Sequence, residues 1–344
     1  MQIGPGDLRD TELTSQAVTS PDRKLVRKLS NIRAGQYTPD DFIIADAKDG
    51  DMAFGLLAPG PQPDGTLKTK SDYLDAATAM TQSNLVDVML LSASSAEVLV
   101  DQGVFKNSPV TPAVRMNDTT DIWMARGSSY TELPSTPFAS ADIEAVSAFC
   151  DIGLYSMTFS NHLESDHASL EAYRRFRLAA RPSGFRHFLE VFNPAFDIGI
   201  PAIELGNYIN DMIIKAIAGV TSSDVPQFLK IQFNGADAMS ELSSYDPERL
   251  VVGILGGAKG TTRDTFELAH QAEQAGARVA LFGRKINLAE APLELVRLLR
   301  ETIGQKSTPE QAVRLYHDHL VAHGIHPQRA LRDDLKITDP VLMS

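Results

Sequence analysis

The amino-acid sequence predicts an α/β protein folded as a single (β/α)8 TIM barrel. Eight short apolar runs read as strands, helical patterns follow most of them, and the set occupies about 270 residues, the size of such a barrel. An open doubly wound sheet is the alternative. It is disfavoured because the segment after the first strand, ADAKDGDMAFG, lacks the G-x-G-x-x-G fingerprint of a dinucleotide-binding fold.

The predicted strands are short runs rich in apolar and β-branched residues. In chain order they are FIIAD (42–46), VDVMLLS (86–92), PAVRM (112–116), DIGLYSM (151–157), RHFLEVF (186–192), FLKIQF (228–233), LVVGILG (250–256) and RVALFG (278–283). Two long connections, 56–70 after strand 1 and 117–142 after strand 3, are expected at the rim of the active site, where long loops are often lids.

Segments on both sides of the barrel complete the predicted organisation. We expect an N-terminal helix that opens at Ser20-Pro21-Asp22 and an extra C-terminal helix over 308–323. The apolar stripe of the latter, with Val313, Leu320 and Val321, fits either an oligomer contact or packing onto the barrel. The predicted division is 1–40 for the N-terminal extension and helix, 41–304 for the barrel and 305–344 for the C-terminal helix and tail.

Composition and charge argue against several classes of protein. The net charge is −12 and no basic stripe is visible, so nucleic acid is not an expected partner. No apolar run reaches the roughly 20 residues that cross a membrane, and the first residues do not resemble a signal peptide. The single cysteine, Cys150, fits a reducing cytoplasm. A small anionic substrate is compatible with this charge, because a few local cations suffice to hold a phosphate.

Lys230 is an unusual residue for its position. In the segment PQFLKIQFNG, the side chains of Leu229, Ile231 and Phe233 share one face of a strand, which leaves Lys230 and Gln232 on the other. The apolar face suits the helix layer, so Lys230 is predicted to point into the barrel. Burial disfavours an ammonium, and a neutral amine is a nucleophile for a ketone or aldehyde. An interior salt bridge, or a misassigned edge strand, is the alternative.

Two glycine-containing segments near the end of the barrel indicate a phosphate site. GILGGAKGTT ends strand 7 with Gly256, Gly257 and Lys259, and ALFGRKI ends strand 8 with Gly283 and Arg284. Phosphate sites in such barrels lie after these two strands, where backbone N–H groups and a helix N-terminus face the anion. Turn glycines and surface cations are the alternative, and finding both segments in the last two repeats favours the phosphate site.

Other polar residues stand on or just after predicted strands. Glu190 lies within the apolar strand FLEVF, where a carboxyl suits proton transfer or an ion pair, even one with the strand 6 lysine. Asp46 ends strand 1 and is either a catalytic or substrate-binding group or a solvated acid. Asp49 and Asp51 are expected to be solvated acids of the loop that follows. Arg115 on strand 3 suits a second phosphate or acid group, or a structural ion pair.

The histidines do not form a recognisable metal site. HLESDH (162–167) and HDHLVAH (317–323) both lack the H-E-x-x-H pattern, and the second lies beyond the predicted barrel. We therefore expect neither a metal nor another cofactor.

The order of the segments DAKDG, FLEVF, FLKIQF, GILGGAKG and ALFGRKI resembles that of the bacterial class I aldolases of the DeoC/LacD group, over about residues 40–290. Tagatose-1,6-bisphosphate aldolase and sulfofructose-phosphate aldolase are the most similar members. The resemblance implies that Lys230 forms a Schiff base and that Glu190 assists proton transfer. It matches Asp46 to the family's strand 1 aspartate and Lys48 to the basic position beside it. The implied phosphate ligands are Gly256, Gly257, Gly283 and Arg284.

The implied reaction cleaves or forms a C–C bond in a phosphorylated ketose and releases dihydroxyacetone phosphate or a similar ketone. A homo-oligomer is also implied. Two features depart from the family: FCDIGLYSM offers Asp151 and Tyr155 instead of a tagatose-type strand 4 lysine, and Phe192 replaces an archaeal-type tyrosine. Lys259 either fills the gap or binds phosphate. A related Schiff-base lyase or thiolase, a metal-dependent aldolase and a non-catalytic sugar-phosphate sensor are the alternatives.

Overall fold

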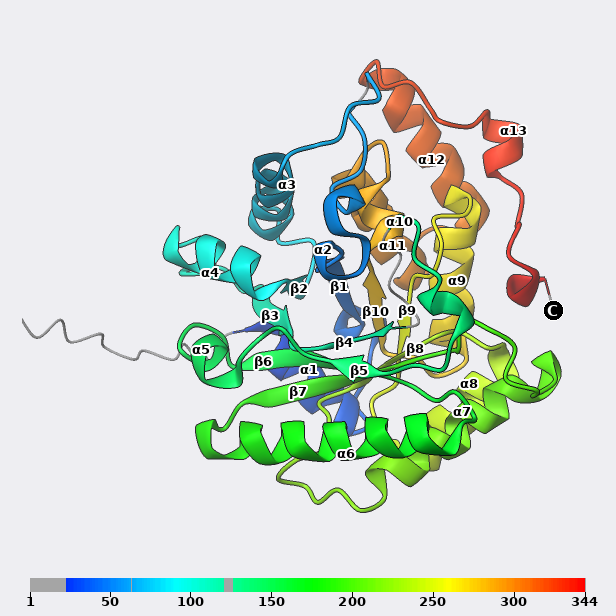
Figure 1. The fold of residues 1–344 in the computed structure, drawn as a ribbon. Coiled ribbons are helices and arrows are strands. Elements are labelled where there is room, and N and C mark those ends of the chain that lie inside the picture. Colours follow the sequence, from blue (N-terminus) through cyan, green and yellow to red (C-terminus); the bar gives the residue numbers. More distant parts are fainter. Residues whose placement is uncertain (1–22, 63, 121–125, 344) are drawn as a thin grey trace, which may run out of the picture.

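Eight parallel strands close into a barrel in the computed structural model, which describes residues 23–62, 64–120 and 126–343 (Figure 1). Around the barrel the order is β1-β10-β9-β8-β7-β6-β3-β2, so consecutive barrel strands are neighbours. The predicted (β/α)8 barrel is confirmed, and each predicted run overlaps one barrel strand. Their bounds are β1 Ile43–Lys48, β2 Val88–Leu91, β3 Thr111–Arg115, β6 Ile152–Thr158, β7 Arg186–Phe192, β8 Leu229–Ile231, β9 Gly253–Leu255 and β10 Val279–Phe282.

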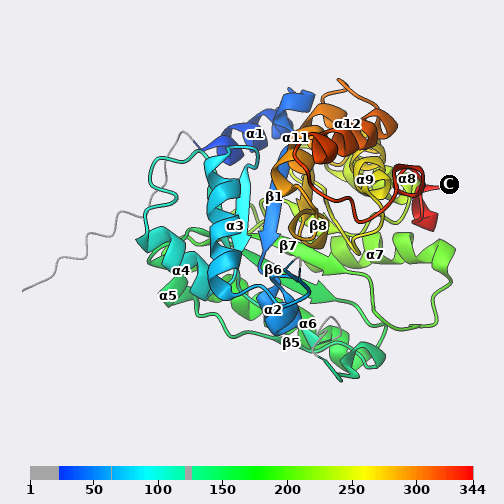
Figure 2. The same cartoon turned by 90° about the horizontal axis from the view of Figure 1, so that it is seen from above.

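Helices surround the barrel on its outside and at both ends (Figure 1 and Figure 2). They are α1 Lys24–Arg33, α2 Asp51–Phe54, α3 Lys70–Gln82, α4 Ala93–Asp101, α5 Ile143–Ser147, α6 Leu163–Ala180, α7 Ala202–Ile217, α8 Ala236–Tyr245, α9 Thr262–Gln274, α10 Arg284–Asn287, α11 Pro292–Ile303, α12 Pro309–Ala322 and α13 Leu331–Asp334. The short strands β4 Asp118–Thr119 and β5 Pro137–Phe138 pair in the connection after β3. Within the described residues, every helix is too short or too polar to cross a membrane.

Strand residues alternate between the barrel interior and the helix layer. On β1, Ile43, Ala45 and Ala47 pack in the interior cluster, whereas Ile44 packs in the outer cluster with the helices. β8 follows the predicted phase, because Leu229, Ile231 and Phe233 belong to the outer cluster. Lys230 and Gln232 therefore project inward, where both line a cavity.

Helix α1 closes the amino end of the barrel. Its residues Leu25, Leu29 and Ile32 are buried in the interior cluster, whereas Val26 is exposed. The Lys28 amine extends this contact by donating a hydrogen bond of 2.8 Å to the Phe42 carbonyl oxygen, just before β1. The predicted opening of this helix at Ser20-Pro21-Asp22 lies outside the described residues.

A buried ion network accompanies the apolar closure. Lys28 Nζ is 3.0 Å from Asp87 Oδ1, and Arg300 of α11 approaches Asp87 Oδ2 at 2.8 Å. The Ile44 backbone N–H also donates to Asp87. Burial lowers the pKa of Lys28 to about 8, although the Asp87 carboxylate opposes the shift. This end of the barrel is thus sealed by apolar packing and by charges that pair with one another.

Helix α12 packs against α9 and α11 on the outside of the barrel. Val313 and Leu320 are fully buried there, whereas Val321 is 73 % exposed. Most of the apolar stripe therefore belongs to the chain's own core, which is one of the two arrangements expected for it.

The segment after α12 returns to the loop between β9 and α9. Thr338 donates to the Asp264 carboxylate from its backbone nitrogen at 2.7 Å and from its hydroxyl at 2.5 Å. The Thr261 hydroxyl donates to the Lys336 carbonyl oxygen at 2.8 Å, and the Thr262 N–H donates to Asp334. Asp264 also caps α9 through the Thr261 N–H. Residues 334–338 thereby hold the end of a loop that begins at the barrel mouth.

Candidate active site

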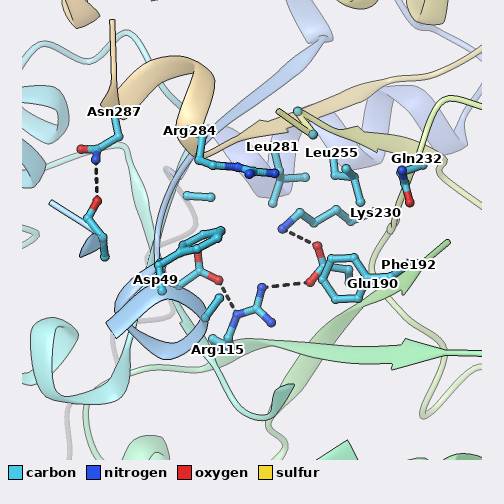
Figure 3. A pocket seen from close by; sticks show the side chains of 18 of the residues that line it. Asp49, Arg115, Glu190, Phe192, Lys230, Gln232, Leu255, Leu281, Arg284 and Asn287 are labelled. Atoms are coloured by element: carbon cyan, nitrogen blue, oxygen red, sulfur yellow. Dashed lines mark hydrogen bonds and ion pairs between the residues drawn. The ribbon is translucent and has the colours of Figure 1, made fainter. Parts of the chain in front are cut away.

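A cavity of about 580 Å³ opens at the carboxyl ends of the barrel strands. Inward-facing strand residues form its floor, and the segments that follow β1, β7, β9 and β10 form its walls (Figure 3). The two long connections also reach it, since Leu57 and Ala58 line it from the first and Thr131 lines it from the second. This is the end of the barrel where loop residues gather around a ligand.

Lys230 reaches the cavity beside Glu190. The two residues are register partners on β8 and β7, and Lys230 Nζ is 2.6 Å from Glu190 Oε1 (Figure 3). Both side chains are almost fully buried, with exposures of 6 % and 1 %. Among the described residues the amine has no second hydrogen-bond partner, so the face that it turns to the cavity is open to a ligand.

Arg115 holds the other oxygen of Glu190. Its Nη2 lies 3.0 Å from Glu190 Oε2, its Nε lies 2.5 Å from Asp49 Oδ2, and its Nη1 lies 3.1 Å from Asp118 Oδ1. Burial lowers the pKa of Arg115, but the three carboxylates outweigh it, so the pKa is raised overall. The Ser156 hydroxyl completes the set by donating to Glu190 Oε2 at 2.8 Å. Of the roles expected for Arg115, the observed one is the ion pair.

Asp46 and Lys48 lie outside this cavity. Both occupy the phase of β1 that faces the helix layer, and Lys48 Nζ is 2.9 Å from Asp46 Oδ2. The Lys48 amine lies 6.0 Å from the ring centroid of Tyr73 on α3. Burial raises the pKa of Asp46, with Lys48 opposing the shift. The structure thus joins these two predicted site residues to each other but not to Lys230.

Asp49 is the strand 1 acid that lines the cavity. It continues the inward phase of Ala45 and Ala47 and is only 4 % exposed. The expectation of a solvated acid is therefore wrong for Asp49, because Arg115 holds its carboxylate inside the barrel. Burial acts to raise the pKa of Asp49, but the charges of Arg115 and Lys230 lower it overall.

Asp51 is partly exposed, and its carboxylate pairs with Lys70 at 2.7 Å. The Ser92 hydroxyl also donates to it, at 2.8 Å. This acid of the loop after β1 thus belongs to the outer end of the segment and not to the cavity.

The four predicted phosphate-binding residues Gly256, Gly257, Gly283 and Arg284 all line the cavity. Gly257 has a φ of +62°, which a glycine adopts without strain. A Cβ at Gly283 would lie 3.1 Å from the Ala47 carbonyl oxygen, so β10 approaches β1 closely there. Arg284 lies over the Phe54 ring at 5.2 Å and has no carboxylate partner among the described residues. Burial lowers its pKa.

Comparison with known proteins identifies this architecture. No protein-family model and no curated protein matches the sequence. Among solved structures, a Schiff-base-forming fructose-1,6-bisphosphate aldolase matches with a TM-score of 0.60 and 17 % identity, over 81 % of this chain and 99 % of the other. The fructose-bisphosphate aldolase from Slackia heliotrinireducens matches with a TM-score of 0.61 and 15 % identity, over 92 % and 96 %. An archaeal fructose 1,6-bisphosphate aldolase matches with 0.59 and 17 %, over 82 % and 99 %.

This chain has the fold of these aldolases. At such identities the likeness concerns the barrel and not the substrate, so the chemistry must be argued from the cavity.

Lys259 turns away from the cavity of this aldolase fold. Its amine donates to the Leu288 carbonyl oxygen at 2.5 Å and to the side chain of Gln328, and lies 3.9 Å from Glu290. Burial lowers the pKa of Lys259. The neighbouring Lys285 is buried and donates to the Lys259 carbonyl oxygen at 3.2 Å. Lys259 does not line the cavity, and these contacts fix the loop after β9.

Strand β6 presents a serine, and not Tyr155, to the site. Tyr155 packs outward against Tyr173 and Phe176, with ring centroids 5.2 and 4.6 Å apart. Ser156 faces inward, and its backbone nitrogen donates to Asn117 Oδ1 at 2.6 Å. The alternation of β6 places Ser156 on the inner face, but a serine between two apolar residues carries little sequence signal.

Two asparagines after β7 and β8 were not predicted as site residues. Asn193 Nδ2 donates to Asn234 Oδ1 at 2.7 Å, and the reverse hydrogen bond measures 3.2 Å. Gln232 Oε1 accepts from the Asn193 backbone N–H at 2.8 Å. Asn193 and Gln232 line the cavity and give its wall neutral polar groups.

Metal ligands do not gather in the described part of the chain, where no three His, Cys, Asp or Glu side chains are arranged to hold an ion. His317 instead pairs with Asp334 at 2.9 Å, and the rings of His319 and His323 stack on the surface.

Proposed function

We propose that this protein is a metal-independent class I aldolase that cleaves or forms a C–C bond in a phosphorylated ketose through a Schiff base on Lys230. The observation that carries the proposal is the Lys230 amine, which faces a cavity of about 580 Å³ and has Glu190 as a proton acceptor 2.6 Å away. The solved neighbours with this fold include an archaeal fructose-1,6-bisphosphate aldolase with its catalytic lysine bound to a carbinolamine intermediate.

The covalent sequence begins with the ketone carbon. Lys230 transfers a proton to Glu190 and attacks the carbonyl carbon of the ketose as a neutral amine. The carbinolamine hydroxyl accepts a proton and leaves as water, which gives a protonated imine. The imine withdraws the electron pair of the C3–C4 bond, so that bond breaks as the C4 hydroxyl loses its proton. An aldehyde departs, the enamine gains a proton at C3, and water releases the ketone and restores the lysine.

Among the described residues that line the cavity, Glu190 and Asp49 are the carboxylates available for these proton transfers. Glu190 is in direct contact with the amine, so we assign it the transfers at the carbinolamine oxygen and the imine. Asp49 lines the same cavity, and we assign it the proton transfer at the C4 hydroxyl. Arg115 orients both carboxylates and is a positioning residue.

Arg284 and the glycines after β9 and β10 are proposed to bind the phosphate of the ketone fragment. The guanidinium has no carboxylate partner in the described chain, and its fork suits a phosphate. Gly256, Gly257 and Gly283 leave space for backbone contacts. Binding energy at this remote group orients the reacting carbons. We place the reaction in the cytoplasm, where the buried Cys150 thiol stays reduced.

Borohydride trapping tests the proposal. The protein is incubated with dihydroxyacetone phosphate, reduced with sodium borohydride and digested, and the adduct is located by peptide mass spectrometry. We expect one adduct, on Lys230. An adduct on another lysine would move the chemistry to that residue, and bound but untrapped ketose phosphates would point to a sensor that binds without turnover.

A further inference from the structure

We propose that the substrate carries a single anionic group, which belongs to the ketone fragment, and that the aldehyde fragment is uncharged. The inference rests on the proposed aldolase function and adds the substrate class. It follows from which charges around the cavity already have partners and which do not.

Three cations line the cavity within the described residues: Lys230, Arg115 and Arg284. Lys230 pairs with Glu190 and becomes the imine during the reaction. Arg115 is occupied by three carboxylates and the Ser156 hydroxyl. Arg284 alone of the three has no carboxylate partner, so the cavity offers one uncompensated positive charge. The phosphate of dihydroxyacetone phosphate would pair with this guanidinium.

Three further lysines at or after the ends of barrel strands are engaged elsewhere. Lys259 donates to the Leu288 carbonyl oxygen, Lys48 pairs with Asp46, and Lys70 pairs with Asp51. The stretch 121–125, outside the described residues, has the sequence DIWMA and contains neither lysine nor arginine. Arg126, which follows it, is exposed and does not line the cavity. A second phosphate would therefore find no ready partner among these groups.

The rest of the wall suits a neutral hydroxylated fragment. Leu57 and Phe192 are apolar and would remove water from a charged group without replacing its hydrogen bonds. The polar groups on this wall include the amides of Asn193 and Gln232. Gln232 Oε1 is used by the Asn193 N–H, which leaves Nε2 without a partner among the described residues and free to donate to a substrate hydroxyl.

A second phosphate would also meet like charge. It would bring a further charge of about −1.5 to −2 into a cavity lined by Glu190 and Asp49. Repulsion between like charges of this kind is enough to favour the neutral aldehyde over the phosphorylated one by roughly tenfold or more.

Matched acceptor aldehydes test the inference. C–C bond formation with dihydroxyacetone phosphate is measured for D- and L-glyceraldehyde against the corresponding glyceraldehyde 3-phosphates, which differ only by the phosphate. We expect kcat/KM to be at least roughly tenfold higher for the better neutral aldehyde. A preference for a phosphorylated aldehyde would overturn the inference.

Substitutions at Gln232 test the placement of the aldehyde. Gln232→Lys adds a cation to this wall, and we expect it to shift the ratio of kcat/KM values toward the phosphorylated aldehyde by roughly tenfold. Gln232→Leu, the matched control, should lower both rates without reversing the ratio. An unchanged ratio in Gln232→Lys would mean that the aldehyde lies elsewhere.

The two proposals fail in different ways. If dihydroxyacetone phosphate leaves no borohydride adduct on Lys230, the aldolase function fails whatever the aldehyde. If the adduct forms but no aldehyde condenses, calorimetric titration with inorganic phosphate decides the substrate class. Phosphate binding at one site, with an affinity that Arg284→Met lowers roughly 10- to 100-fold, would support a substrate with a single anionic group. Phosphate binding at two sites would refute the inference.

Discussion

The two ends of the barrel each contain a buried lysine held by a carboxylate, but of these two lysines only Lys230 lines the cavity. At the amino end, Lys28 of α1 contacts Asp87 and the Phe42 carbonyl oxygen, and Arg300 completes the network. At the carboxyl end, Lys230 contacts Glu190, and Arg115 completes the network. The components are alike: an ammonium, a carboxylate and a guanidinium.

The difference lies in what surrounds the amine. Lys28 belongs to the helix that closes the barrel, and its amine contacts a carboxylate and a carbonyl oxygen. Lys230 has one described partner and faces a cavity of about 580 Å³. The carboxyl end also contains Arg284, a guanidinium without a carboxylate partner in the described chain. Burial and pairing are thus common to both lysines, whereas an open face beside an uncompensated cation distinguishes Lys230.

The largest expected contrast comes from removing each lysine in turn. Lys230→Met should abolish the borohydride adduct, because no amine remains at the cavity. Lys28→Met should keep the adduct but lower the free energy of unfolding by about 3 kcal/mol, because it breaks a buried ion pair. Mass spectrometry and urea denaturation measure the two effects. If the Lys28→Met variant were folded but formed no adduct, the amino end would take part in the chemistry.

Glu190→Gln should have the next largest effect. The amide keeps the size of the side chain but cannot accept the lysine proton, so we expect kcat to fall by about 10²- to 10⁴-fold. Borohydride trapping should persist at a lower rate, because the amine is still present. Single-turnover trapping rates and steady-state kcat separate these steps, and an unchanged kcat would remove Glu190 from the proton transfers.

A matched pair on β1 sharpens the comparison within the carboxyl end. Asp49→Asn should lower kcat by at least about tenfold, since Asp49 lines the cavity, whereas Asp46→Asn should change kcat by less than about threefold. Both variants are isosteric, so circular dichroism should show the same fold. The opposite order of effects would mean that the family's strand 1 aspartate does act from Asp46.

The smallest expected effect is a pH dependence at the closed end. Burial lowers the pKa of Lys28 to about 8, below that of the unfolded chain at about 10.4. Between these values the unfolded state binds more protons, so stability rises with pH. Relative to Lys28→Met, the wild type should gain about 1 kcal/mol between pH 8 and pH 9 in urea denaturation. A flat difference would indicate that the Lys28 ammonium is retained throughout this range.

Strand periodicity predicted the barrel and the inward face of β8. Each predicted run overlaps a barrel strand, because its apolar residues pack either in the interior or against the helix layer. Lys230 stood out because its neighbours Leu229 and Ile231 fixed the phase of the strand. Glu190 was found in the same way, as a charge within an apolar run.

The phase of β1 was harder to predict, because all six residues of the strand are buried. Asp46 looked like the better catalytic acid, but its charge is balanced by Lys48 two residues later, on the same outer face. The inner face carries Ala45 and Ala47, whose small side chains give no polar signal, and Asp49 continues that face beyond the strand. The ion pair that holds Asp49 joins it to Arg115, which is distant in the sequence, and the local sequence pattern does not predict such a contact.

The contacts of residues 334–338 with the loop after β9 have a consequence for protein engineering. Thr261 and Asp264 are tied to Lys336 and Thr338, which lie about 75 residues further along the chain. A chimera that exchanged only the glycine loop with that of another barrel would separate the loop from the partners that shape it. The transplantable unit consists of two segments, and a graft should carry the loop and its distant anchor together.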